Sequence, residues 1–453
     1  MIPRRVLIAA LLGVTGCAGY TSYSPLIDEA LVHEDYAGAL EVVEKISRSN
    51  SELLYCYEKA LVLRAQGEYA ASNETLERAE ILLVELYTRS VTRELASLAV
   101  SETVSQYRGD AFEAIRVNYY KILNYLALDD VDGALVECRR LNRKLQMLHD
   151  GGETYFVDDP FLQYLTALVY EMGGESESAG VSFRTAAARY GESGDGWAGG
   201  APPWMYCDAS ANARRRGDAA AAAAYDSLAT CDGSGDATGR VTVVIEAGRV
   251  VRKLESNLVL PIFEKDDWSD RDRFAHELAG RRGVVYDHPA KVKYWLRVSL
   301  PVLEPRPPGV AYAVVKATRT EGEHRGTVDT RTVRVEDLDA QAAQAFREKE
   351  STVLLRAIIR GIGKFVASEA ARDKDDTLGA LVNLLGVVTE TADTRSWTTL
   401  PEVILVARLD LPEGRYRLEA DVVDGHGRTV NRVGFGEVDV RAGSSRIQTA
   451  RAY

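Results

Sequence analysis

A short motif near residue 395 brings together three side chains that could bind a ligand. Asp393, Arg395 and Trp397 place a carboxylate, a guanidinium and an indole within five residues. This mixture could recognise a partner or a glycan, because guanidinium groups pair with anions and an indole combines an apolar ring with a hydrogen-bond donor. The alternative is structural, with Arg395 paired locally and Trp397 packed where a helix returns to a sheet. We favour the structural interpretation.

A second candidate set lies in the middle of the N-terminal half. Glu137, Arg139 and Arg140 occupy the polar side of a helix that apolar spacing predicts after residue 131. A solvated helix face is the simpler interpretation, and a clamp for a peptide carboxylate is the functional one. Together with Tyr119 on the preceding helix, these residues form the predicted partner-binding site.

Other motifs that could indicate catalysis or ligand binding do not lie in the structural context that such a function requires. The segment Gly361-Ile-Gly-Lys364 resembles the end of a phosphate loop, but it lies inside an amphipathic helix and follows no strand. The pair Asp129-Asp130 is better explained by a turn and a helix cap than by acid/base chemistry. Cysteine spacing matches no zinc pattern. We therefore expect no enzyme activity, no cofactor and no metal. None of the histidines accompanies a nucleophile motif; they are His33, His149, His276, His288, His324 and His426.

The elements that would position these residues are helical in the first half of the chain. Residues 111–128 and 131–148 each carry an apolar stripe at helical spacing, and the pair resembles a tetratricopeptide (TPR) hairpin. Tyr36 and Tyr69 follow two similar turns and are 33 residues apart, close to the TPR period. One hairpin cannot bury its apolar face alone, so neighbouring hairpins must stack against it. We predict a TPR-like α-solenoid over residues 17–230.

After a Gly- and Asp-rich linker at residues 231–239, the hydrophobic period changes from 3.6 to 2. Residues 291–300 alternate most regularly, and a hairpin is expected around Ala247-Gly248. Residues 240–453 are predicted to form a β-sandwich-like domain with a helical insertion at about 337–392, whose second helix would begin at Asp376. The predicted fold class is therefore α+β.

The amino terminus has the features of a bacterial lipoprotein signal. Arg4 and Arg5 precede an apolar run, and Val14-Thr15-Gly16-Cys17 resembles a lipobox. We expect residues 1–16 to be a signal peptide and Cys17 to be lipidated. Because Ala18 follows instead of the aspartate that retains lipoproteins in the inner membrane, the expected location is the periplasmic face of the outer membrane.

Two further cysteines are candidates for a disulfide bond. Cys207 and Cys231 flank one predicted helical hairpin, so the two ends should meet. An oxidising periplasm would allow this bond to form.

Composition narrows the possible partners. The chain has 453 residues and a formal net charge of −12, which argues against nucleic-acid binding because such proteins need a concentrated basic surface. No stretch of the sequence is apolar for the roughly 18 to 20 residues that span a bilayer. The expected membrane contact is the lipid anchor alone.

Several segments together resemble an uncharacterised family of bacterial outer-membrane lipoproteins with a TPR-like helical N-terminal half. The segments are residues 118–126, 133–141, 248–253 with Leu260-Pro261, and 392–397 with Leu400-Pro401. The resemblance implies an envelope lipoprotein and no catalytic residues. It also suggests a partner among envelope lipoproteins or cell-wall synthases.

We therefore predict a non-enzymatic scaffold that binds a protein partner on the concave face of its helical half. The alternative is a glycan- or ligand-binding, or hydrolytic, module in the β domain near Asp393 to Trp397.

Overall fold

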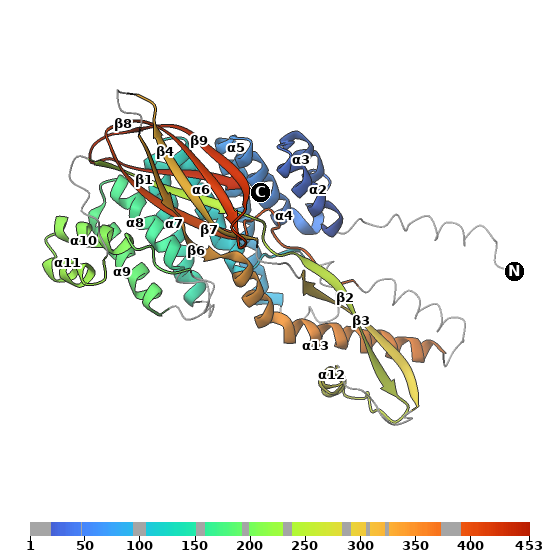
Figure 1. Cartoon of the computed structure of the whole chain (residues 1–453). Helices are drawn as coiled ribbons and strands as arrows, with labels where there is room; N and C mark the ends of the chain where they lie inside the picture. Colours follow the sequence, from blue (N-terminus) through green and yellow to red (C-terminus); the bar gives the residue numbers. More distant parts are fainter. Residues whose placement is uncertain are drawn as a thin grey trace.

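The computed structural model describes residues 20–46, 48–93, 106–150, 159–192, 199–229, 238–282, 291–304, 309–321, 326–372 and 391–453. Within these residues the N-terminal half is helical and the C-terminal half contains all the strands (Figure 1). The N-terminal helices are α2 (Tyr20–Val32), α3 (Tyr36–Val43), α4 (Arg48–Ala65), α5 (Tyr69–Arg93), α6 (Ala111–Ala127), α7 (Val131–Asp150), α8 (Pro160–Met172), α9 (Ser176–Glu192), α10 (Met205–Arg215) and α11 (Ala219–Asp226).

These helices pack as consecutive pairs, α2 with α3 through α10 with α11, as in TPR-like repeats. The same turn recurs inside each pair. A residue with a left-handed backbone is followed by an acidic residue, and the next helix begins directly after it. Asp35 accepts a hydrogen bond from the backbone N–H of Gly38 at 2.9 Å, and Asp130 accepts one from Gly133 at 2.8 Å. The left-handed residues are Glu34, Gly67, Asp129, Gly174 and Gly217.

The C-terminal half contains two four-stranded sheets that face each other. One sheet has the order β10-β1-β7-β6 and the other has the order β5-β4-β8-β9. Alternate side chains such as Val243, Leu405, Val315 and Leu418 fill the space between them. The strands are β1 (Thr238–Ala247), β4 (Val310–Arg319), β5 (Thr327–Arg331), β6 (Val333–Asp337), β7 (Val403–Pro412), β8 (Gly414–Asp424), β9 (Thr429–Val440) and β10 (Ser445–Ala452).

The outer face of the first sheet packs against the helices. Val244, Val406 and Ile447 belong to the same apolar core as the side chains of α4, α6 and α8. Helices, first sheet and second sheet therefore form three layers (Figure 1). Because the first sheet is covered on both faces, β1 is apolar at successive positions instead of alternating.

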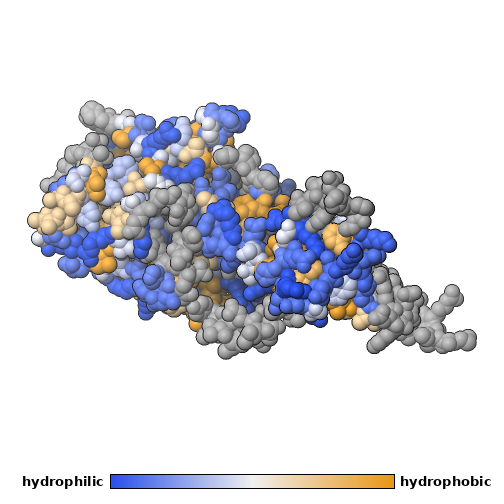
Figure 2. Space-filling view, turned by 90° about the horizontal axis from the view of Figure 1, so that it is seen from below, coloured by the Kyte–Doolittle hydropathy of each residue, from blue (hydrophilic) through white to orange (hydrophobic). Residues whose placement is uncertain are grey.

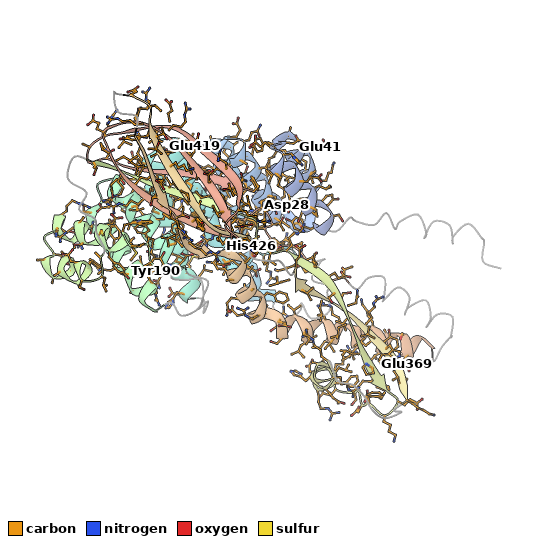
Figure 3. All side chains as sticks on the ribbon, viewed as in Figure 1. Asp28, Glu41, Tyr190, Glu369, Glu419 and His426 are labelled. Atoms are coloured by element: carbon orange, nitrogen blue, oxygen red, sulfur yellow. The ribbon has the colours of Figure 1, made fainter. Side chains whose placement is uncertain are left out.

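A separate arm projects from this body (Figure 1). It consists of the paired strands β2 (Lys253–Phe263) and β3 (Val292–Leu303), helix α12 (Arg271–Gly280) and part of the long helix α13 (Leu338–Arg372). Its own small core holds Leu260, Leu296 and Phe365. Lys293 pairs with Glu369 at 2.5 Å near the outer end of the arm (Figure 3). Seen from below, the surface of the arm is mostly hydrophilic, with scattered apolar side chains (Figure 2).

The hairpin expected around Ala247-Gly248 is wrong. Strand β1 pairs with β7 and β10, whereas β2 pairs with β3 in the arm. The physical reason is that β1 is a central strand, buried on both faces. A hairpin with β2 would leave one of these faces without the apolar neighbours that bury it. The predicted helical insertion begins as α13 at Leu338, and its second helix from Asp376 lies outside the described residues.

Candidate functional site

The segment before β7 carries the predicted Asp393–Trp397 motif into the inner face of the helical half. The side chain of Trp397 is 0% exposed. Its ring stacks on Tyr57 of α4 with a centroid distance of 4.1 Å and an interplanar angle of 13°. Tyr120 of α6 lies 5.7 Å away. An indole without exposed surface cannot stack on a sugar, so Trp397 packs the interface between the halves.

Two buried glutamates hold the backbone of this segment. Glu113 accepts a hydrogen bond from the N–H of Trp397 at 2.8 Å, and Glu58 accepts one from the N–H of Thr398 at 2.9 Å. Glu58 also accepts from the hydroxyl of Thr399 at 2.6 Å and from Tyr20. Burial raises the pKa of Glu58 from 4.5 to about 7. The helical half therefore holds this segment by hydrogen bonds to both its backbone and its side chains.

Arg395 pairs locally, as the structural interpretation expects. Its guanidinium donates to both carboxylate oxygens of Asp393, at 2.8 and 2.7 Å. The fork-shaped pairing fixes Arg395 close to the ring of Tyr107. Asp393 and Arg395, unlike Trp397, line a cavity at the base of the arm.

Two of the four residues predicted to bind a partner on the central hairpin are buried. Tyr119 is 0% exposed, and Glu137 is buried beneath Lys121, whose Nζ lies 3.0 Å from its carboxylate. Arg140 pairs with Glu77 of α5 at 2.8 Å. Arg139 is half exposed and pairs with Glu175. The expectation that these four residues together contact a partner needs correction, because Tyr119 and Glu137 have no free surface.

Around α6, the inner face of the helical half is not the open groove that the sequence led us to expect. Helix α6 contacts both β10 and α13, so the C-terminal half of the chain covers this face. Arg116 of α6 is fully buried and lies 2.7 Å from Glu336 and 3.1 Å from Asp159. Arg139 and Arg140 lie on α7, the outer helix of the same pair. At α6 the chain itself therefore fills the surface that a partner was expected to use.

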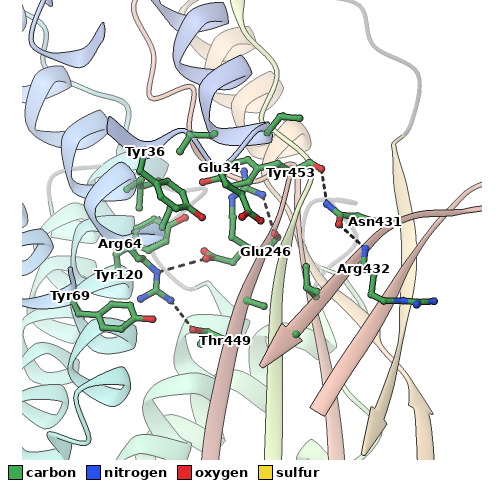
Figure 4. Close-up of a pocket in the computed structure, with 18 of the residues that line it drawn as sticks. Glu34, Tyr36, Arg64, Tyr69, Tyr120, Glu246, Asn431, Arg432, Thr449 and Tyr453 are labelled. Atoms are coloured by element: carbon green, nitrogen blue, oxygen red, sulfur yellow. Dashed lines mark hydrogen bonds and ion pairs between the residues drawn. The ribbon is translucent and has the colours of Figure 1, made fainter. Parts of the chain in front are cut away.

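One part of the inner face stays open, as a cavity of about 550 Å³ between the helices and the C-terminal strands (Figure 4). Tyr36, Tyr69 and Arg64 line its helical wall, and Tyr453 closes the other side. Arg64 donates to Asn124 at 2.6 Å and to Thr449 at 2.9 Å, which fixes its guanidinium beside the ring of Tyr69. The cavity is therefore lined by aromatic and polar side chains from both halves.

The strand wall of this cavity consists of two sheet edges. Among the described strands, β9 ends one sheet and β10 ends the other. Residues 430–434 of β9 and 449–451 of β10 both line the cavity. An edge strand presents backbone N–H and C=O groups that can pair with another extended chain. The only sequence signal for this site is the recurrence of tyrosine after the turns, at Tyr36 and Tyr69.

Cys207 is disulfide-bonded. Its expected partner, Cys231, lies outside the described residues, so the pairing stays a prediction. Cys17 and the expected signal peptide lie outside them as well. Cys56 and Cys138 are buried.

The described part of the chain shows neither a metal cluster nor a membrane-spanning helix. No group of His, Cys, Asp or Glu there could hold a metal ion. No described helix has the length and apolar character that crossing a bilayer requires.

Comparison with solved structures gives distant matches. No known protein family and no curated protein matches the sequence. Among solved structures, MamA protein matches 46% of this chain and 88% of its own, at 13% identity and a TM-score of 0.29. BtubC from P. vanneervenii matches 46% and 76%, at 16% identity and a TM-score of 0.31. A thermophilic TPR protein from Thermus thermophilus matches 46% and 89%, at 14% identity and a TM-score of 0.23. At these values the matches assign neither a family nor an activity to this chain.

Proposed function

We propose that this protein is a non-enzymatic scaffold that binds an extended segment of a protein partner in the cavity between the helices and strands β9 and β10. The observation that carries the proposal is the meeting of two sheet edges with a tyrosine-lined helical wall. Backbone pairing at a sheet edge supplies affinity, and the adjoining pockets for side chains supply specificity.

The types of residue in the cavity suit this role. Tyrosine and arginine are over-represented among the residues that dominate binding energy at protein interfaces. Tyr36 and Tyr69 are half-buried and project from different helical hairpins. Arg64 is fixed before any partner arrives, so little side-chain entropy is lost on binding.

We place this scaffold in the bacterial envelope, on the periplasmic face of the outer membrane and anchored through lipid on Cys17. The support is the Arg-Arg, apolar and Val-Thr-Gly-Cys order at the amino terminus. A disulfide at Cys207 agrees with an oxidising compartment. The partner would then be another envelope lipoprotein or a cell-wall synthase. Fatty-acid labelling tests the anchor: Cys17→Ser should abolish the label, and a labelled variant would overturn this placement.

Photocrosslinking in intact envelopes tests the binding site. A crosslinking amino acid at Tyr36 or at Asn431 should capture the same protein, because both positions line the cavity from opposite walls. Asp329, exposed on β5 at the opposite edge of the sheet that β9 ends, is the matched control and should capture none of it. Equal capture from Asp329, or none from the two cavity positions, would reject the cavity as the binding site.

A further inference from the structure

A second cavity, of about 340 Å³, lies at the base of the arm and shares no lining residue with the first. Four separate parts of the chain build it: the segment before α6, the inner part of α13, the β2–β3 sheet and the Asp393–Arg395 segment. Phe346 and Val353 supply an apolar patch in its wall. Its charged side chains are Arg108, Lys253, Lys349, Arg356, Arg360 and Arg395, with Asp110, Glu350 and Asp393.

The cavity is thus lined by twice as many cations as carboxylates, although the whole chain carries a net charge of −12. Each of the three carboxylates already has a cation. Lys253 and Lys349 both approach Asp110, at 3.1 and 2.6 Å. Asp393 is held by Arg395 at 2.7 Å, and Glu350 by Arg282, outside the cavity, at 3.0 Å. The positive charge of the wall is therefore not neutralised from within.

Two of the arginines are placed to meet a ligand. Arg108 is exposed and comes from the segment before α6, whereas Arg356 is half-buried and comes from α13. Within the described residues neither of them forms an ion pair. A guanidinium presents planar pairs of donors that match carboxylate and phosphate oxygens.

We propose that this cavity binds an anionic ligand that carries at least two carboxylate or phosphate groups, held by Arg108 and Arg356. One anionic group faces each arginine, and the apolar patch of Phe346 and Val353 covers the body of the ligand. The cavity volume falls at the lower end of the range for small-molecule sites, which suits a compact polyanion. This site is independent of the peptide site between the helices and strands β9 and β10.

Calorimetric titration of the full-length chain with citrate and with tripolyphosphate tests the proposal. At least one probe should bind saturably, and affinity should fall as salt rises from about 50 to about 300 mM, because ions screen the attraction. Preference for citrate identifies a carboxylate ligand, and preference for tripolyphosphate a phosphate ligand. Absence of saturable binding by both probes would overturn the proposal.

Charge reversal supplies the matched comparison. R108E/R356E should weaken binding at least about tenfold, because two charge-assisted contacts become repulsive. R271E/R347E makes the same change in net charge at exposed positions outside the cavity and should leave affinity within about twofold. The single variant R108E alters an exposed side chain, so it should stay folded and still weaken binding at least about threefold. Equal affinity in all these variants would refute the site.

Discussion

At the scale of single residues, the carboxyl group of Glu58 should make the stability of the protein depend on pH. Burial raises its pKa to about 7 in the folded state, whereas in the unfolded chain it returns to about 4.5. The folded state therefore keeps a proton that the unfolded state releases between these two values. Raising the pH through this window favours unfolding and should remove up to about 3 kcal/mol of stability. Urea unfolding at pH 5, 6, 7 and 8 measures the effect.

Glu58→Gln carries no titratable group, so its free energy of unfolding should vary less with pH between 5 and 7. Glu177→Gln is the control, because that side chain is 84% exposed. A variant at position 58 that keeps the wild-type pH profile would show that another group titrates.

Trp397 offers a second residue-scale prediction. Trp397→Ala removes a ring stacked on Tyr57 at the interface of the two halves and should cost about 3–5 kcal/mol. Trp295 of β3 is 59% exposed, so Trp295→Ala should change stability by less than about 1 kcal/mol. Guanidinium unfolding compares the two. Similar losses for both would contradict the role of Trp397 as the packed contact.

At the scale of elements, the arm should loosen separately from the body. Phe365 packs against Trp268 and Tyr294 in a core that is distinct from the core of the helices. Phe365→Ala should raise amide hydrogen exchange in β2, β3, α12 and the outer part of α13 and leave α6 protected, because local opening follows core boundaries. Faster exchange in α6 as well would mean that the arm and the body open together.

The sequence predicts the helices and strands better than it predicts which of them pair or pack together. Turn acids such as Asp130, together with helical spacing, indicate the helical pairs, and alternation indicates β3. Strand β1 pairs with β7, and Val244 faces Val406 across a long separation in sequence that alternation does not encode. Glu137 looked like part of a solvated face because its buried partner Lys121 lies on another helix. The sequence does not reveal the tyrosine-lined cavity either, because its walls come from distant parts of the chain and meet only in the folded structure.

At the scale of the whole molecule, one buried charge cluster joins the helical half to the first sheet. Arg116 of α6 pairs with Asp159 before α8 and with Glu336 of β6. Arg116→Met leaves two carboxylates without their cation and should cost about 3–5 kcal/mol. Circular dichroism and tryptophan fluorescence should still report one coincident transition, because the halves share a core.

Adding Glu336→Gln to Arg116→Met should recover part of the loss, since it removes one of the stranded charges. Non-coincident transitions in either variant would indicate that the helical half is stable without the sheet.

The position of β10 has a consequence for biosynthesis. Strand β10 follows all the described helices in sequence, yet it lies parallel to β1 and against α6. Whether the chain emerges from a ribosome or from an export channel, the described helical pairs appear well before the residues that cover them. The inner face of these helices stays uncovered until residues 445–452 have emerged. A chaperone that shields α6 in the interval would protect the chain from aggregation.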